Sequence, residues 1–282
     1  MTTSPGIAPE IAVGRRIDVD GVTAGPVDTF YLDAGSGDPV LLLHGSGPGV
    51  SAWANWQRTI PGLSEHFRVL APDIVGYGAT ARPDDVRYSL RTWTDHVLGF
   101  MDALGIERAS LVGNSLGGRL SLALAEEHPD RVARMVLMGS PGVGMTITDG
   151  LRALRGYEPS MANMRALLLD YFAVDKAIIT EDLVRIRYEA SVDTFDAYRA
   201  MFFDPRHAGN DLAITEEQVR SIHTPALLVH GREDKVVPPA VSWAMVNLLP
   251  DADLHVFARC GHWTQIERAA EFTELVAGFL KG

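Results

Sequence analysis

The stretch Leu111-Val112-Gly113-Asn114-Ser115-Leu116-Gly117-Gly118 joins an apolar run to a helical pattern. Residues 109–112 have the character of a buried strand, and residues 119–127 repeat apolar positions at helical spacing. A Gly-x-Ser-x-Gly motif between a strand and a helix is typical of a nucleophile elbow, a strained turn with room only for small neighbours. The turn would expose the Ser115 hydroxyl at a helix N-terminus, where partial positive charge favours developing negative charge. An ordinary glycine-rich turn is the alternative for this motif taken alone.

The composition is that of a globular protein large enough for one α/β domain with an insertion: 282 residues, 46% of them hydrophobic and 22% charged. A net charge of -11 argues against nucleic acid and anionic membranes as partners, and an anionic substrate would need a local cation. The single cysteine, Cys260, permits no intrachain disulfide and fits a reducing compartment. Residues 1–16 lack the apolar segment of a secretion signal, and no apolar run approaches the roughly 18 residues of a membrane span. We therefore expect a cytoplasmic protein without membrane contact.

Strand and helix patterns alternate along most of the chain, which favours a mostly parallel sheet with helices on both faces. The eight predicted strands span residues 15–20, 27–33, 40–43, 67–71, 109–112, 132–138, 226–229 and 253–257. The predicted helices that flank them span residues 52–63, 92–104, 115–127, 241–249 and 264–280. After the sixth strand there is no strand pattern, but there are helical stretches at residues 161–172, 180–190 and 195–203. We therefore expect a core domain of residues 1–139 and 211–282, with residues 140–210 forming a helical lid.

A second glycine-rich loop, His44-Gly45-Ser46-Gly47-Pro48-Gly49, follows the third predicted strand. In folds with a nucleophile elbow of this kind, such a loop supplies one backbone N–H of the oxyanion hole, and the residue after the nucleophile supplies the other. We therefore expect the N–H groups of Ser46 and Leu116 to form the oxyanion hole. A plain glycine turn is less favoured, because the loop precedes the Ser115 motif at the right place in the strand order.

Two further loops offer partners for the serine, whose hydroxyl becomes a good nucleophile only when a base held by a carboxylate takes its proton. His230-Gly231-Arg232-Glu233-Asp234 follows the seventh predicted strand and offers Asp234 as the acid, with Glu233 as its competitor. Cys260-Gly261-His262-Trp263 follows the eighth strand and offers His262 as the base. Structural places are expected for His44, His128 and His223. The order of serine, aspartate and histidine predicts an α/β-hydrolase fold with Ser115, Asp234 and His262 as the catalytic residues.

Five segments carry a more specific resemblance. They are His44-Gly45-Ser46-Gly47-Pro48-Gly49, Trp53-Ala54-Asn55-Trp56, Gly113-Asn114-Ser115, Arg187-Tyr188-Glu189-Ala190 and Gly261-His262-Trp263-Thr264-Gln265. Together they resemble the meta-cleavage product hydrolases, serine enzymes of bacterial aromatic degradation, over essentially the whole chain. The resemblance is strongest to the branch that acts on 2-hydroxymuconate semialdehyde and its 6-alkyl analogues. It implies hydrolysis of the C5–C6 bond of a 2-hydroxy-6-oxo-hexa-2,4-dienoate to 2-hydroxypenta-2,4-dienoate and a carboxylic acid.

The resemblance also implies roles for side chains outside the triad. Arg187, from the lid, would bind the substrate's carboxylate, and Asn114 and Asn55 would assist it. From the residues alone, Arg187 would be assigned to a helix surface, and Asn114 could serve only the structure of the elbow. Trp263 would form a flat aromatic wall for the conjugated substrate, although a tryptophan there could also simply pack in the core.

The pocket for the substituent at C6 of the substrate is expected near Val236, Val237 and residues 138–143, and its preferred size is left open. The resemblance implies a homodimer or larger oligomer, and we expect no metal and no organic cofactor. A carboxylesterase or lactonase on the same triad, a hydrolase of 6-phenyl dienoates and a ligand-binding receptor with a slow triad are the alternatives. A haloalkane dehalogenase would need an aspartate where Ser115 stands.

Overall fold

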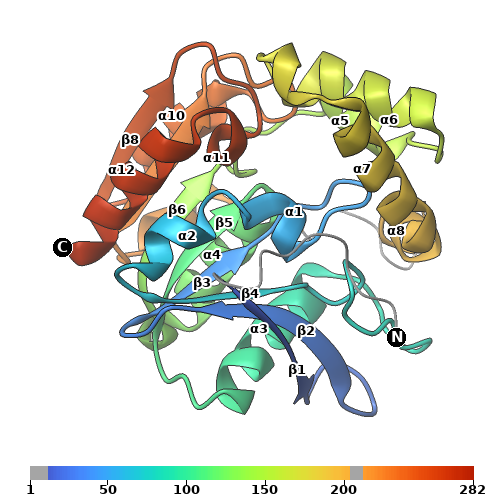
Figure 1. Cartoon of the computed structure of the whole chain (residues 1–282). Helices are drawn as coiled ribbons and strands as arrows, with labels where there is room; N and C mark the ends of the chain where they lie inside the picture. The colour runs from blue at the N-terminus through green and yellow to red at the C-terminus, as the bar shows by residue number, and fades with distance from the viewer. Residues whose placement is uncertain (1–11, 204–211) are drawn as a thin grey trace.

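The computed structural model describes residues 12–203 and 212–282, and an eight-stranded sheet lies at its centre (Figure 1). The strands are β1 (Val13–Val19), β2 (Val27–Ala34), β3 (Pro39–Leu43), β4 (Arg68–Pro72), β5 (Ala109–Asn114), β6 (Val132–Met138), β7 (Ala226–Gly231) and β8 (Ala252–Phe257). Their spatial order is β1-β2-β4-β3-β5-β6-β7-β8. β1 and β2 pair in antiparallel fashion, β2 is antiparallel to β4, and the remaining pairs are parallel. The predicted mostly parallel sheet is confirmed.

Helices cover both faces of the sheet, and each face has its own apolar core. Alternate residues of the central strand β3 show the division, because Leu41 and Leu43 enter one core while Val40 and Leu42 enter the other. The first core contains residues of α3 (Leu90–Ala103), α4 (Leu116–Glu127) and α10 (Pro239–Val246). The second contains residues of α1 (Ala52–Trp56), α2 (Ile60–Ser64) and α12 (Ala269–Lys281).

Two predicted helices are each broken into a pair. The helix expected at residues 52–63 ends at Trp56 and restarts at Ile60, because Pro61 has no N–H to continue the ladder of hydrogen bonds from one segment to the next. The helix expected at residues 264–280 is divided into α11 (Thr264–Glu267) and α12. Arg268, at the break, has φ -125 and ψ 42, which are not helical angles.

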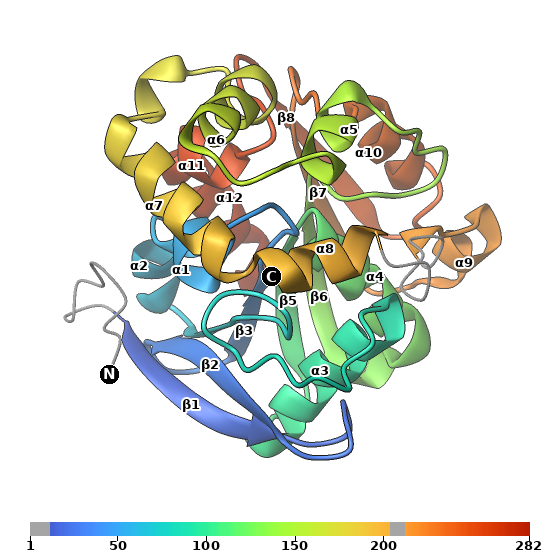
Figure 2. The ribbon, with the colours of Figure 1, turned by 90° about the vertical axis from the view of Figure 1, so that its right-hand side faces the viewer.

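Between β6 and β7 the chain leaves the sheet and forms helices over its carboxyl edge (Figures 1 and 2). We call residues 140–203 the insertion. Its helices are α5 (Asp149–Arg155), α6 (Met161–Leu167), α7 (Glu181–Asp193) and α8 (Phe195–Phe203), with shorter helical turns at Leu168–Phe172 and Lys176–Ile178. α9 (Glu216–Ser221) follows before β7. The predicted helical character of residues 161–203 is confirmed, whereas α5 and α9 were not predicted, and residues 204–210 of the expected lid lie outside the described residues.

The unpredicted α5 begins at the cap residue Thr148, whose hydroxyl oxygen accepts a hydrogen bond from the Leu151 N–H at 3.1 Å. The same hydroxyl donates to the Val236 carbonyl at 2.8 Å, so the start of the insertion is attached to the loop after β7. A helix of only 7 residues shows little apolar periodicity, and its position depends on this contact. Within the described residues, no helix combines the length and the apolar character needed to cross a membrane.

Candidate active site

Ser115 occupies a strained turn between β5 and α4. Its backbone angles are φ 51 and ψ -111, an unusual conformation for a residue with a side chain, and its N–H donates to the Met138 carbonyl at 2.8 Å. A Cβ on Gly113 would lie 2.3 Å from the Gly117 carbonyl oxygen, and one on Gly117 would lie 2.1 Å from the Leu43 carbonyl oxygen. The glycines of the motif are therefore required by close backbone packing. The turn is the predicted elbow, and Ser115 stands at the first residue before the helix.

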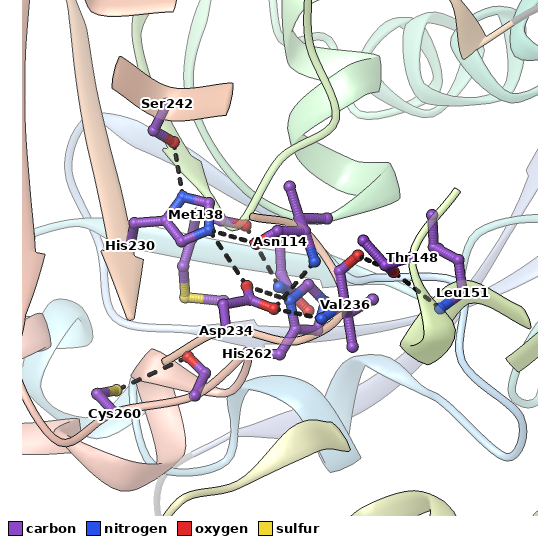
Figure 3. Close-up of polar contacts among 12 residues, drawn as sticks. Asn114, Met138, Thr148, Leu151, His230, Asp234, Val236, Ser242, Cys260 and His262 are labelled. Carbon is purple, nitrogen blue, oxygen red and sulfur yellow. Dashed lines mark hydrogen bonds and ion pairs between the residues drawn. The ribbon is translucent and has the colours of Figure 1, made fainter. Parts of the chain in front are cut away.

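Asp234 and His262 meet in a buried hydrogen bond of 2.7 Å between Oδ2 and Nδ1 (Figure 3). The other oxygen of Asp234, Oδ1, accepts the backbone N–H groups of Val236 at 2.7 Å and Val237 at 2.9 Å. Burial by itself would raise the pKa of Asp234, but the charges and hydrogen bonds of His262 and a second histidine, His230, hold that pKa below its ordinary value. Asp234 is therefore an anion, and it orients the ring of His262 with Nε2 free to act as a base.

Glu233, the competitor for the acid position, points elsewhere. Its Oε2 accepts the Cys260 N–H at 3.1 Å, and its Oε1 accepts hydrogen bonds from Arg232. The backbone hydrogen bond from Cys260 is the main reason why the pKa of Glu233 lies below its ordinary value. Glu233 thus fixes the loop that carries His262, and Asp234 alone of the two reaches the imidazole. His44 has the expected structural place, with Nδ1 2.7 Å from the Gly45 carbonyl and Nε2 accepting the Ile74 N–H at 3.0 Å.

The backbone around His262 is fixed by the insertion and by α11. The His262 N–H donates to the Phe172 carbonyl at 2.8 Å, and the two rings meet edge to face at 5.6 Å. Glu267 accepts three backbone N–H groups with its one carboxylate, those of Gly261 at 2.7 Å, Val174 at 2.8 Å and Asp175 at 2.9 Å. The histidine loop and residues 172–175 of the insertion are therefore held as one unit.

A small polar cavity brings together most of the predicted site residues. It has a volume of about 20 Å³, and the predicted residues that line it are Ser46, Asn55, Asn114, Ser115, Arg187, His262 and Trp263. Leu116 lies on a neighbouring, larger cavity, which also contains Ser46 and Ser115. Among the described residues, neither the Ser46 N–H nor the Leu116 N–H donates to another protein group. Both are therefore available to an oxygen bound beside Ser115.

Arg187 is a buried cation in this cavity. It projects from α7, only 4% of its surface is exposed, and one guanidinium nitrogen donates to the Pro48 carbonyl at 2.9 Å. The guanidinium carbon lies 5.5 Å from the centre of the Trp263 ring. No carboxylate lies within ion-pair distance of Arg187 in the part of the chain that the structure describes, and its Nε has no hydrogen-bond partner there. Burial lowers its pKa to about 10, which still leaves it charged at neutral pH.

The two asparagines differ in how the protein holds them. Asn114 donates from Nδ2 to the Met138 carbonyl at 3.4 Å, so part of its amide serves the elbow. Asn55 is 4% exposed, and its Nδ2 has no partner among the described residues. Since buried amide donors normally find an acceptor, Asn55 is a polar group available for a ligand. Trp263 packs against Phe172 at 4.9 Å between ring centres, so it is both part of the core and a wall of the cavity.

The larger cavity beside Ser115 has a volume of about 450 Å³ and mostly apolar walls. Of the residues predicted there, Val237, Pro141 and Gly142 line it, whereas Val236 does not. Most of its wall comes from residues that the sequence did not indicate: Leu151, Leu154, Tyr198, Met201, Phe202, Leu212 and Ile214. They lie on α5, on α8 and just before α9, and their common feature in the sequence is only a large apolar or aromatic side chain. No local motif marks them.

The eight-stranded sheet, the serine at the elbow after β5 and the acid and base at the ends of β7 and β8 define an α/β-hydrolase. The family model described as alpha/beta hydrolase fold matches residues 38–269. A 2-hydroxy-6-oxo-2,4-heptadienoate hydrolase of Pseudomonas putida is 48% identical over 262 residues, which are 92% of this chain and 95% of the relative. A 2-hydroxymuconate semialdehyde hydrolase of Pseudomonas sp. strain CF600 is 47% identical over 98% of this chain and 96% of its own length.

A solved structure agrees with the sequence comparisons. The meta-cleavage product hydrolase from Pseudomonas fluorescens IP01, a serine-to-alanine mutant complexed with acetates, superposes with a TM-score of 0.89 at 48% identity. The match covers 95% of this chain and 98% of that one. The chain therefore belongs to the α/β-hydrolase fold family and, within it, to the meta-cleavage product hydrolases.

Proposed function

We propose that this protein hydrolyses the C5–C6 bond of 2-hydroxymuconate semialdehyde and its 6-alkyl analogues in the degradation of aromatic compounds. The observation that carries the proposal is the buried Arg187 guanidinium, which has no described carboxylate partner and lies in the same cavity as Ser115. A buried cation is costly unless an anion joins it, so the site favours a substrate with a carboxylate. A simple ester or lactone offers no such group. The names of the two relatives, at 48% and 47% identity, support the same substrates.

We assign the two cavities to the two ends of such a substrate. The carboxylate and the 2-oxygen would lie in the polar cavity, against Arg187 and the amides of Asn55 and Asn114. The C6 carbonyl would lie beside Ser115, where the two cavities share residues. The substituent on C6 would then enter the apolar cavity. A volume of about 450 Å³ would also hold a phenyl ring, so the preference for hydrogen or alkyl substituents rests on the relatives.

The site residues act mainly in the second of two stages. In the first stage the substrate becomes a ketone at C2: its 2-hydroxyl loses a proton and C5 gains one, so that the fragment can depart as an enolate conjugated with the 2-oxo acid. Ser115, or a water molecule beside it, then adds to the C6 carbonyl, and the N–H groups of Ser46 and Leu116 hold the oxyanion. His262 takes the proton of the attacking hydroxyl, and Asp234 stabilises the imidazolium that forms.

The products balance these steps. When the C5–C6 bond breaks, its electron pair leaves with the C5 fragment, which becomes 2-hydroxypenta-2,4-dienoate. The oxygen of water ends on C6 and completes the carboxylic acid. An acyl-enzyme on Ser115 and a gem-diol formed by activated water both fit this geometry, and rapid-quench mass spectrometry of Ser115 distinguishes them.

The test uses the yellow 2-hydroxy-6-oxohepta-2,4-dienoate and follows the loss of its visible absorbance. We expect rapid bleaching with release of acetate and 2-hydroxypenta-2,4-dienoate. A neutral ester such as 4-nitrophenyl acetate is the matched substrate, and its kcat/KM should be far lower. Brisk ester hydrolysis without bleaching would make the protein a carboxylesterase. A series with hydrogen, methyl, ethyl and phenyl at C6 then measures the preference of the apolar cavity.

We also propose that the insertion is the lid of the site and that the protein is a cytoplasmic homodimer or larger oligomer. The insertion supplies Arg187 and much of the apolar cavity, which supports the first assignment. Trp243 is 66% exposed on α10 beside the edge strand β8, whose Val256 is also exposed, and such a surface is suited to a second copy of the chain. Sedimentation equilibrium should give a mass of at least twice 30.6 kDa, and a monomer would contradict this.

A further inference from the structure

A second imidazole contacts the oxygen of Asp234 that faces His262. His230 lies at the end of β7 and is fully buried, and its Nε2 is 3.3 Å from Asp234 Oδ2 and 2.8 Å from the Val237 carbonyl oxygen (Figure 3). Its Nδ1 lies 2.7 Å from the hydroxyl of Ser242, which is 2% exposed on α10. Neither His230 nor Ser242 has a role in the reaction proposed above.

The partners of His230 place a proton on its Nε2. The Val237 carbonyl and the Asp234 carboxylate can only accept hydrogen bonds, so Nε2 must carry a hydrogen. The Ser242 hydroxyl can donate to Nδ1 or accept from it. The ring is therefore held by hydrogen bonds at both ends, as expected of a fully buried polar group. Its N–H is aimed at the carbonyl oxygen and the carboxylate together.

Oδ2 of Asp234 is consequently shared between two imidazoles. The bond to His262 is 2.7 Å and the contact to His230 is 3.3 Å, while Oδ1 is occupied by two backbone N–H groups. Each donor draws negative charge from the carboxylate, and a hydrogen bond to the charged form stabilises it. The part of the Asp234 negative charge that stabilises the N–H of His230 is not available to stabilise a proton on His262. His230 therefore both fixes the carboxylate in place and limits its pull on the imidazolium.

We infer that Ser242, His230 and Asp234 form a hydrogen-bonded chain that positions Asp234 and shares with His230 the carboxylate oxygen that holds His262. This assignment of positioning residues rests on the proposed function for its catalytic meaning. An alternative is that His230 only packs α10 against β7. The alternative predicts lower stability on substitution, with no change in the titration of His262.

The groups that surround this chain are few. The loop after β7 contributes Glu233 and Lys235, and the segment after β8 contributes Cys260 and Glu267. The side chain of Met138, at the end of β6, lies beside His230. Burial, followed by the Glu267 charge, raises the pKa of Cys260, so its thiol stays neutral. The Lys235 ammonium donates to the Asp170 carbonyl on the insertion, away from Asp234.

The test compares His230→Met, which has a similar volume and no donor, with His230→Gln, whose amide N–H can replace Nε2–H. Ser242→Ala is the milder third variant. The NMR titration of His262 is followed in the free protein, together with the low-field resonance of its Nδ1–H. For His230→Met we expect the His262 midpoint to rise by roughly half a pH unit to one unit. His230→Gln should restore most of the wild-type value, and Ser242→Ala should give a smaller rise.

The acid limb of kcat/KM for the dienoate should move in the same direction. An unchanged or lowered His262 midpoint in all the folded variants would overturn the inference, whatever happens to their melting temperatures. If His230→Met does not fold, Ser242→Ala decides the matter: a raised His262 midpoint supports the inference, and an unchanged or lowered midpoint overturns it. Because the NMR titration uses no substrate, its outcome is independent of whether the dienoate reaction is the right one.

Discussion

The carboxyl edge of the sheet and the insertion contribute to the site in different ways. The loops after β3, β5, β7 and β8 carry the reacting groups, and backbone hydrogen bonds hold them, as with the two N–H groups on Asp234 and the Ser115 N–H on Met138. The insertion carries Arg187 and most of the apolar wall. Its polar contacts with the sheet loops include Thr148 to Val236 and His262 to Phe172. We therefore expect the sheet loops to determine the chemistry and the insertion to select the substrate.

This difference predicts that substitutions at the sheet edge remove turnover of every substrate, whereas substitutions in the insertion change which substrate is turned over.

The largest effect is expected for Ser115→Ala at the sheet edge. Loss of the nucleophile should lower kcat at least about 10³-fold for the dienoate and the neutral ester alike. The melting temperature should change little, because the Ser115 hydroxyl is not part of the backbone contacts that hold the turn. Stopped-flow absorbance and calorimetry measure the two quantities. Retention of ester hydrolysis by the variant would show that another group attacks the substrate.

The next largest effect is expected for Arg187→Gln in the insertion. Loss of a charge-assisted contact of about 1.5–3 kcal/mol should lower kcat/KM for the dienoate by roughly 10- to 100-fold. Ester hydrolysis should stay within a few fold of wild type, and stability should rise because an unpaired buried charge is gone.

Arg185→Gln is the matched control for Arg187. Arg185 lies on the same helix, is exposed and pairs with Asp182 and Glu189. It should leave both substrates unaffected, because exposed ion pairs contribute little. Equal losses on the dienoate and the ester for Arg187→Gln would mean that Arg187 supports the fold and does not bind the carboxylate.

A third prediction concerns Glu267, where the two regions are joined. Its carboxylate accepts N–H groups from Gly261 of the histidine loop and from Val174 and Asp175 of the insertion. Glu267→Ala should lower kcat/KM about tenfold on both substrates and reduce stability by about 1 kcal/mol, because the part-buried Gly261 N–H and the two exposed N–H groups of the insertion lose their acceptor. Glu271→Ala, which removes an exposed partner of Arg268, is the control. A lower kcat/KM for the dienoate alone would show that Glu267 affects substrate selection, as residues of the insertion are expected to do.

The sequence predicted the sheet, and it indicated the candidate reacting residues, because both have local signals. Buried parallel strands appear as short apolar runs, and the ends of the eight strands agree with the predicted ends within two residues. Ser115, Asp234 and His262 each follow such a run, and the structure brings Asp234 and His262 within 2.7 Å. Their meeting follows from topology, because the carboxyl ends of parallel strands gather at one edge.

The residues of the insertion that line the cavities, and the residues that support the candidate triad, could be predicted less well. Arg187 lies between charged neighbours, so only the family resemblance distinguished it from a surface residue. The wall residues Tyr198 and Met201 face the cavity because of how α8 packs, and their own segment does not determine that. His230 appeared only as the first residue of the loop after the seventh predicted strand. Its importance depends on a contact with Asp234 across a tight turn and with Ser242 on another element, and neither has a local signal.

The smallest predicted effect is on stability and uses the buried charge of the sheet edge. The folded protein holds the pKa of Asp234 below its unfolded value of about 3.9, since the histidine charges and hydrogen bonds outweigh burial. The ionised form is thus favoured by folding, and its stabilisation is present above about pH 4 and is lost as the pH falls towards the folded-state pKa. In urea titrations, wild type should therefore lose more stability than Asp234→Asn as the pH is lowered from 5 to about 2. Glu181→Gln, at an exposed ion pair of the insertion, should follow wild type throughout. Parallel curves for wild type and Asp234→Asn would show that the Asp234 charge does not stabilise the folded protein. The sheet edge and the insertion would then differ only in geometry.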